Sequence, residues 1–124
     1  MLSLRPDVVL IDYGLNDRGP GLERARTAWM QMITQSQAAN VKVIVLTPTG
    51  DSSANLLNPE DKLSLHAEQI RRLAADHNTG LADSTYVYVA HLKAGGKIED
   101  LLSHCNHPNR AGHELVANAL MQWF

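Results

Sequence analysis

The sequence predicts a three-layer α/β/α domain built on a parallel sheet. Short apolar runs alternate with longer stretches of helical period along the 124 residues, which is the order of βαβ units. The apolar runs are close to continuous, as expected for strands that are covered on both faces. No repeat, low-complexity tract or linker interrupts this order, so residues 1–124 are interpreted as one domain, and 44% hydrophobic residues suffice for a core.

The first half of the chain contains two predicted strands and the helix between them. Val8 to Tyr13 is the first strand, and Gly14 ends it. Residues 21–39 are predicted to form an amphipathic helix, because their apolar side chains recur close to helical spacing. Val41 to Leu46 repeats the pattern of a buried strand, which stops at Thr47-Pro48 because proline cannot donate a hydrogen bond to the ladder.

A second helix is predicted after the following loop. Asn58 is its expected N-cap, Pro59 takes the first helical position, and Gly80 closes the helix. Residues 80–83 then form a short third strand.

The last third of the chain is predicted to be mainly helical. Residues 85–90 fit either a strand or a helix, and the helix is preferred because Gly95-Gly96 makes a good C-terminal stop. A final helix begins at Asn109, its predicted N-cap. Three histidines on the predicted helices are expected at the surface or rim: His66, His77 and His91.

Composition excludes several classes of protein. The net charge is -2, and no basic cluster is longer than Arg71-Arg72, so nucleic-acid binding is unsupported. The single Cys105 rules out an internal disulfide and fits a reducing compartment. No apolar run approaches the roughly 20 residues of a membrane span, and no apolar leader follows Met1. A cytoplasmic chain is expected, or a secreted one if an upstream signal segment is missing.

The segment Gly14-Leu15-Asn16-Asp17 is the first candidate motif. It lies where the first strand ends, and ligands of open parallel sheets gather beyond the carboxyl ends of the strands. The Asn16 side chain carries two N–H donors without a charge, which suits a developing oxyanion. The competing interpretation is a simple turn, because Asn and Asp bond their own backbone, and Asp17 is assigned to fixing that turn.

The second candidate motif is His107-Pro108-Asn109. Pro108 disfavours the helical region for His107 and leaves it extended just before a helix begins. An imidazole exchanges its proton near neutral pH, so His107 suits the general base of an acyl transfer. A lone histidine that packs or caps is the alternative.

Together, Gly14-Leu15-Asn16-Asp17 and His107-Pro108-Asn109, followed by Ala111-Gly112-His113, resemble the SGNH (GDSL) family of serine esterases and lipases. The resemblance spans nearly the whole chain, with strand and loop segments in the family's order. It implies a flavodoxin-like SGNH fold, an oxyanion-hole role for Asn16 and the catalytic base at His107. It implies no cofactor.

Two departures from the family pattern limit this transfer. The family opens with a strand ending in Gly-Asp-Ser, whose serine is the nucleophile, and then offers a glycine that completes the oxyanion hole. Only thirteen residues precede Gly14, so the chain resembles an N-terminally truncated domain. Three positions before His107 stands His104, where the family has the aspartate that orients the base. A neutral imidazole could orient His107 but cannot offset a forming imidazolium, and Asp100 is the residue that could substitute through space.

Other possible reactive residues have simpler explanations. Ser52, in Gly50-Asp51-Ser52-Ser53, mimics the missing nucleophile block, but it comes after the Gly-x-Asn-Asp block, and its neighbours are ordinary loop residues. Cys105 is adjacent to the base region, where neighbouring side chains rarely point together. The cluster of His104, His107 and His113 does not follow the spacing of zinc motifs, so no metal is expected.

The predicted function is therefore hydrolysis of a small ester by an SGNH-type acylhydrolase, esterase or lipase. His107 is the base, Asn16 the oxyanion donor and His104 the neighbour of the base, while the nucleophilic serine is missing or supplied elsewhere. The alternative is a non-catalytic binding or assembly module that keeps the scaffold. A nucleotide-binding flavodoxin-like domain is disfavoured because no glycine-rich phosphate loop follows any strand.

The first strand also predicts association. Without the family's first two strands, Val8 to Tyr13 becomes an apolar edge, and such edges pair with other chains. A homo-oligomer, or pairing with a missing N-terminal segment, is expected.

Overall fold

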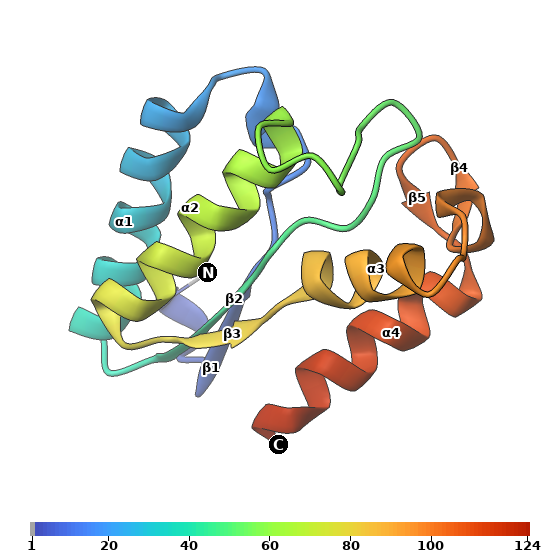
Figure 1. Cartoon of the computed structure of the whole chain (residues 1–124). Coiled ribbons are helices and arrows are strands. Elements are labelled where there is room, and N and C mark those ends of the chain that lie inside the picture. Colours follow the sequence, from blue (N-terminus) through green and yellow to red (C-terminus); the bar gives the residue numbers. More distant parts are fainter. Residues whose placement is uncertain (1) are drawn as a thin grey trace.

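The computed structural model describes residues 2–124 and confirms the α/β class with a parallel sheet (Figure 1). The sheet contains β1 (Val8–Ile11), β2 (Lys42–Leu46) and β3 (Gly80–Ala82) in the order β1-β2-β3. Val9 pairs with Val43, and Ile44 pairs with Gly80. The strands are nearly all apolar, which fits a sheet with helices on its faces.

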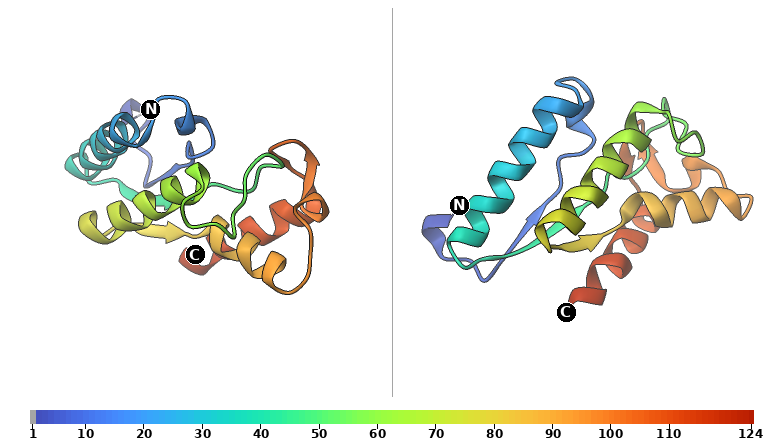
Figure 2. Two further views of the ribbon diagram at one scale, coloured as in Figure 1. Left: turned by 45° about the horizontal axis from the view of Figure 1, so that its top comes forward. Right: turned by 60° about the vertical axis from the view of Figure 1, so that its left-hand side comes forward.

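The described residues contain four α-helices, three of which pack on this sheet. Helices α1 (Leu22–Ala38) and α2 (Lys62–His77) pack on one face, and α4 (Arg110–Leu120) packs on the other. Helix α3 (Ser84–Lys93) packs against α4. In both views of Figure 2 the C-terminal part of the chain lies to one side, away from α1.

Short elements complete the chain. They are η1 (Leu2–Leu4), η2 (Asn16–Arg18), η3 (Ile98–Asp100), the hairpin strands β4 (Leu102–His104) and β5 (His107–Pro108), and η4 (Met121–Trp123).

The main hydrophobic core lies between the sheet and the pair α1 and α2. Trp29 and Ile33 of α1 are almost fully buried there, against Val45 of the central strand and Ile70 of α2. A smaller cluster on the opposite face joins Ile44 and its neighbours to α4. Helices cover that face less fully at the edge strand β1, where Leu10 is 47% exposed.

The predicted boundaries of α2 are wrong at both ends. Its N-cap is Asp61, whose carboxylate accepts the N–H of Leu63 at 2.8 Å, while Asn58 and Pro59 lie in the preceding turn. Its C-cap is Asn78, in the left-handed conformation with φ 51. Asparagine tolerates that conformation better than other residues with a side chain, so no glycine is needed there. Gly80 instead begins β3.

Two further expectations need correction, and two are confirmed. The first strand ends at Ile11 rather than at residue 13, because the Tyr13 carbonyl already accepts the N–H of Asn16 in the next turn. His66 is 3% exposed rather than superficial. It lies on the buried stripe of α2, one turn from Leu63.

Residues 85–90 are helical, as predicted, and Asn109 caps α4 through a hydrogen bond from the Gly112 N–H.

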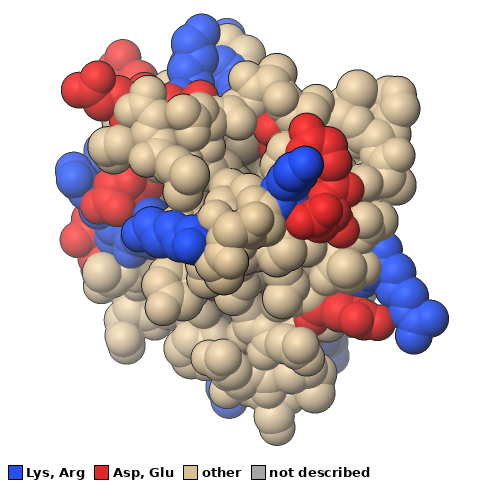
Figure 3. Space-filling model, turned by 45° about the vertical axis from the view of Figure 1, so that its right-hand side comes forward, with Lys and Arg blue, Asp and Glu red and all other residues tan. Residues whose placement is uncertain are grey.

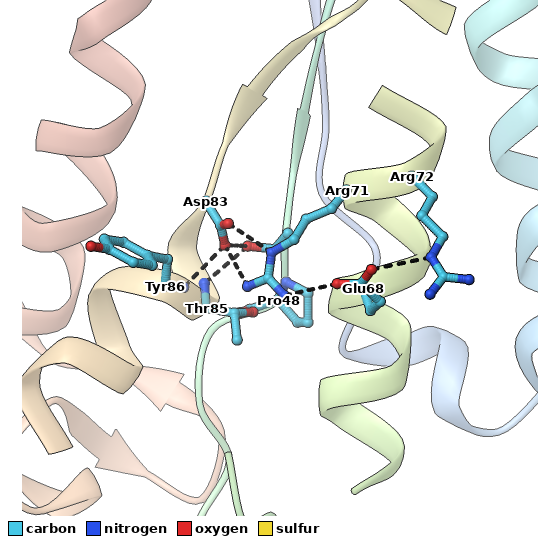
Figure 4. Close-up of polar contacts among 8 residues, drawn as sticks. Pro48, Glu68, Arg71, Arg72, Asp83, Thr85 and Tyr86 are labelled. Atoms are coloured by element: carbon cyan, nitrogen blue, oxygen red, sulfur yellow. Dashed lines mark hydrogen bonds and ion pairs between the residues drawn. The ribbon is translucent and has the colours of Figure 1, made fainter. Parts of the chain in front are cut away.

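The Asp83 carboxylate joins three parts of the domain at the carboxyl end of the sheet (Figure 4). It accepts hydrogen bonds from the Thr47 hydroxyl at 2.8 Å, from Nε of Arg71 at 2.8 Å and from the Tyr86 N–H at 3.0 Å. A second Arg71 nitrogen bonds the other carboxylate oxygen at 3.0 Å, which makes the pair bidentate. Asp83 is thereby also the N-cap of α3.

Thr47 and Thr85 close the same network. The Thr85 N–H donates to the Thr47 hydroxyl at 2.9 Å, and the Thr85 hydroxyl donates to the Pro48 carbonyl at 2.6 Å. Both threonines are buried, so their polar atoms need such internal partners. The end of β2 is therefore fixed to the start of α3.

The Asp83 network predicts a loss of stability in acid. Burial alone would raise the pKa of Asp83, but the hydrogen bonds from Arg71, Thr47 and Tyr86, with the guanidinium charge, lower this pKa below its usual value of 3.8. The unfolded chain therefore binds the proton more readily than the native chain. The stabilisation is complete above pH 3.8 and is lost as the pH falls through the lower native pKa.

Denaturant unfolding of the wild type and of Asp83→Asn, measured from pH 6 to pH 2, tests this expectation. The variant should have a lower free energy of unfolding at pH 6 and a shallower decline in acid. Asp76→Asn, on the exposed side of α2, should follow the wild-type curve. Parallel curves for wild type and Asp83→Asn would contradict the assignment.

Candidate active site

A pocket of about 210 Å³ brings the two sequence motifs together at the carboxyl end of β1. Its lining consists of Asp12, Tyr13, Leu15, Asn16, Asn106 and His107. Asn16 comes from the turn after the first strand, and His107 comes from the hairpin near the C-terminus. Residues far apart in the sequence thus meet where an open parallel sheet binds ligands.

The Asn16 turn is anchored on both sides. The backbone N–H groups of Asn16 and Asp17 donate to the Tyr13 carbonyl at 3.0 and 3.3 Å. The Asp17 carboxylate accepts the indole N–H of Trp29 at 2.6 Å, and Trp29 is buried in α1. Gly14 allows the turn to approach the segment that follows β2, because a Cβ there would lie 2.9 Å from Cδ of Pro48. The Asn16 side chain is exposed.

The hairpin of β4 and β5 places His107. The strands are antiparallel, with His104 opposite His107, and Cys105 makes the turn between them with a left-handed φ of 38. His107 is extended immediately before Pro108, as the sequence predicts. Its ring is exposed and lines the pocket.

The hairpin is tied to the start of α4. The Asn109 side chain accepts the Gly112 N–H at 3.0 Å and donates to the Asp100 carbonyl at 2.8 Å. Gly112 permits the close packing of this helix, because a Cβ there would collide with the Leu101 carbonyl and the Tyr88 hydroxyl. These contacts fix the backbone that carries His107.

The residue beside His107 is His104, whereas the family resemblance leads one to expect an aspartate there. The rings of His104 and His107 lie 6.3 Å apart between centroids and are inclined by 28°. Asp100 bonds elsewhere, since its carboxylate lies 3.0 Å from Nε2 of His91 and accepts the Lys97 N–H at 2.8 Å. Within residues 2–124, no hydrogen bond joins Asp100 to His107.

Asp12 is a pocket residue that the sequence analysis did not single out. It follows β1 directly, and burial raises the pKa of its carboxyl group even though the residue as a whole is exposed. The sequence offered a sign of this role, because Asp12 is a charged residue at the carboxyl end of a buried strand, where ligands bind in open parallel sheets. It adds a carboxyl group to the pocket that holds His107 and Asn16.

The pocket lining contains no serine, threonine or cysteine. Ser52 is exposed and lies beside the hairpin rather than in this lining, and its N–H donates to the Cys105 carbonyl at 2.9 Å. The Cys105 sulfur lies 3.7 Å from Nε2 of His104.

Further structural features concern metals, charge and membranes. Among the described residues, no three His, Cys, Asp or Glu side chains gather as metal ligands would. No helix within residues 2–124 is long and apolar enough to cross a bilayer. With the side that carries α3 and α4 turned forward, Figure 3 shows acidic and basic side chains in small groups on a largely uncharged face.

Solved structures of acetyl xylan esterases and of an α/β hydrolase share this fold. The acetyl xylan esterase AlAXEase superposes with a TM-score of 0.83 at 26% identity, over 99% of this chain and 69% of that protein. Axe2, an acetylxylan esterase from Geobacillus stearothermophilus, was solved as a catalytic mutant with an aspartate replaced by alanine. It gives a TM-score of 0.84 at 19% identity, and the superposition covers 98% of this chain and 61% of Axe2. LAE5, an α/β hydrolase from the Lake Arreo metagenome, gives a TM-score of 0.77 at 22% identity. The superposition covers 98% of this chain and 61% of LAE5.

The shared region is a part of those proteins, since this chain spans 61% to 69% of their lengths. Two other catalytic mutants of Axe2 carry alanine in place of a serine or a histidine. Among curated proteins, none matches this sequence significantly.

The family model for the GDSL-like lipase/acylhydrolase family matches residues 1–115. This match includes both the Asn16 turn and the His107 hairpin, which the fold brings to one pocket. The chain therefore belongs to the GDSL-like lipase/acylhydrolase family.

Proposed function

We propose that this chain supplies the base and an oxyanion donor of an SGNH-type ester hydrolase. The observation that carries the proposal is the shared pocket of His107 and Asn16. Neither side chain makes a hydrogen bond to another described residue, so both are free to meet a substrate. The family match supports acyl-ester chemistry at this pocket.

In the proposed reaction, a serine hydroxyl attacks the acyl carbon while His107 takes its proton. The amide N–H groups of Asn16 donate to the oxygen that becomes negative. Collapse of the intermediate expels the alcohol, which receives the proton from His107. Water then attacks the acyl-serine by the same route and releases the acid.

The serine is proposed to come from outside the described pocket lining, because that lining holds no hydroxyl nucleophile apart from the Tyr13 phenol. The structural neighbours include acetyl xylan esterases, and a pocket of about 210 Å³ suits a small acyl group. Acetyl esters are therefore the proposed substrates.

Ester hydrolysis by the complete gene product that contains this chain tests the proposal. With p-nitrophenyl acetate, His107→Gln should lower kcat by about 10³-fold or more, since the base is lost. Asn16→Ala should lower it by about 10² to 10³-fold. His113→Gln, an exposed histidine on α4, should leave turnover unchanged.

A fluorophosphonate probe with peptide mapping locates the nucleophile in the same samples. A labelled serine that is not part of the described pocket lining is expected. Wild-type turnover in His107→Gln would overturn the assignment of the base. No turnover and no labelled serine would instead support a binding or assembly module.

His104 is proposed as the neighbour that restricts the His107 ring, since the two rings lie side by side. It cannot compensate the positive charge of an imidazolium as a carboxylate does. His104→Asp should therefore raise kcat for p-nitrophenyl acetate, by about 10-fold if the added carboxylate gains 1.4 kcal/mol in the transition state. Equal or lower kcat in a folded His104→Asp protein would contradict this expectation.

Strand β1 is proposed to pair along its free edge with another strand, which a second copy supplies in the isolated chain. Leu10, 47% exposed on this edge strand, supplies apolar surface for such pairing. The isolated chain should form a dimer in size-exclusion chromatography with light scattering, and Leu10→Lys should dissociate it. Leu65→Lys, at a similarly exposed leucine of α2, is the control. A wild-type monomer at high concentration would contradict self-pairing.

A further inference from the structure

The loop that imitates a nucleophile block carries a buried carboxylate instead. Asp51 is 6% exposed, and both of its carboxylate oxygens accept hydrogen bonds. One oxygen accepts a hydrogen bond from Nη2 of Arg18 at 2.5 Å, and the other accepts from the N–H and hydroxyl of Ser53 at 2.7 and 2.6 Å. A buried carboxylate without such partners would be strongly unfavourable.

Both ends of this ion pair lead to the proposed active site. Arg18 is the last residue of η2, the turn that begins with Asn16, and its Nε also donates to the Leu15 carbonyl at 3.2 Å. On the other side, Ser52 follows Asp51 and donates its N–H to the Cys105 carbonyl at 2.9 Å. Cys105 lies in the turn between His104 and His107.

The contacts form one connected path from the oxyanion donor to the base. Among residues 2–124, no hydrogen bond joins the Asn16 turn directly to the His107 hairpin. The loop of Asp51 is the polar connection between them. An error of about 1 Å in the placement of catalytic groups can cost about 100-fold in rate.

The charge state of the pair is consistent with a permanent link. Burial by itself would raise the pKa of Asp51, but the hydrogen bonds from Ser53 and Arg18 and the positive charge of Arg18 lower it below its usual value. The carboxylate is therefore ionised at neutral pH, where it pairs with Arg18. Arg18, at 24% side-chain exposure, remains partly open to solvent.

We infer that Arg18 and Asp51 are positioning residues, which hold the Asn16 turn and the His107 hairpin at the separation that catalysis requires. This inference rests on the proposed esterase function. Neither residue lines the pocket, so neither is assigned contact with the substrate. The loop that resembles a nucleophile block thus serves the geometry of the site.

The first test is structural and independent of turnover. Nuclear magnetic resonance spectra of the full chain should show shifts of the Asn16 side-chain amide and of the His107 imidazole in Asp51→Asn. Arg18→Gln should give the same shifts, and Arg18→Lys, which keeps the charge, should give smaller ones. Arg72→Gln breaks the exposed Arg72–Glu68 pair of 3.1 Å on α2 and should leave both signals in place.

The second test uses the hydrolytic gene product. Asp51→Asn and Arg18→Gln should lower kcat for p-nitrophenyl acetate by about 10 to 100-fold with little change in KM, because alignment rather than binding is lost. Arg18→Lys should recover part of the kcat. If Asp51→Asn does not fold, Arg18→Gln provides the measurement, because its side chain is partly exposed.

The two proposals fail in different ways. Unchanged Asn16 and His107 signals in folded Arg18→Gln would overturn the positioning role, whatever the turnover. Full kcat in folded Arg18→Gln would overturn it as well. Absence of turnover in the wild type, with shifted signals in the variants, would overturn the esterase proposal and leave the structural link standing.

Discussion

The carboxylate of Asp83 is the contact on which the junction of β2, α2 and α3 at the carboxyl end of the sheet depends. It binds a side chain from the end of β2, a guanidinium from α2 and the first turn of α3. Because β3 contains only three residues, its ladder alone gives the chain little hold as it leaves the sheet. Asp83 fixes that exit, and it caps α3, which leads to the hairpin that carries His107.

Asp51 also pairs with an arginine, but this pair connects loops rather than elements of the scaffold. Asp83 fixes neighbouring elements of the scaffold, whereas Asp51 connects two loops that carry the proposed catalytic groups. A buried ion pair contributes little net stability once desolvation is counted, but its geometry is restrictive, because moving either partner leaves a charge uncompensated. Such a pair is suited to fixing positions. The inferred role of Arg18 and Asp51 is therefore to set the distance between Asn16 and His107, and removing either partner would also destabilise the fold by leaving the other charge uncompensated.

Local sequence patterns predicted the fold well and the long-range contacts poorly. The apolar run at residues 41–46 and the Asn109 cap are local signals, and the structure confirms both. The cap of α2 was misplaced because Asn58 and Asp61 are both good caps, and the sequence does not rank them. The partner of Asp51 is 33 residues away, and no periodicity reports such a pair. Asp12 was missed although its position after a buried strand marked it.

In each of the two motifs, one side chain makes structural hydrogen bonds and another makes none within residues 2–124. Asp17 bonds Trp29, and Asn109 caps α4. The side chains of Asn16 and His107 make no hydrogen bond within residues 2–124, and both are exposed in one pocket. Folding alone does not require an asparagine or a histidine at these positions. Their chemical groups are available for a ligand, and this division, more than the presence of the motifs, is the physical argument for catalysis at this site.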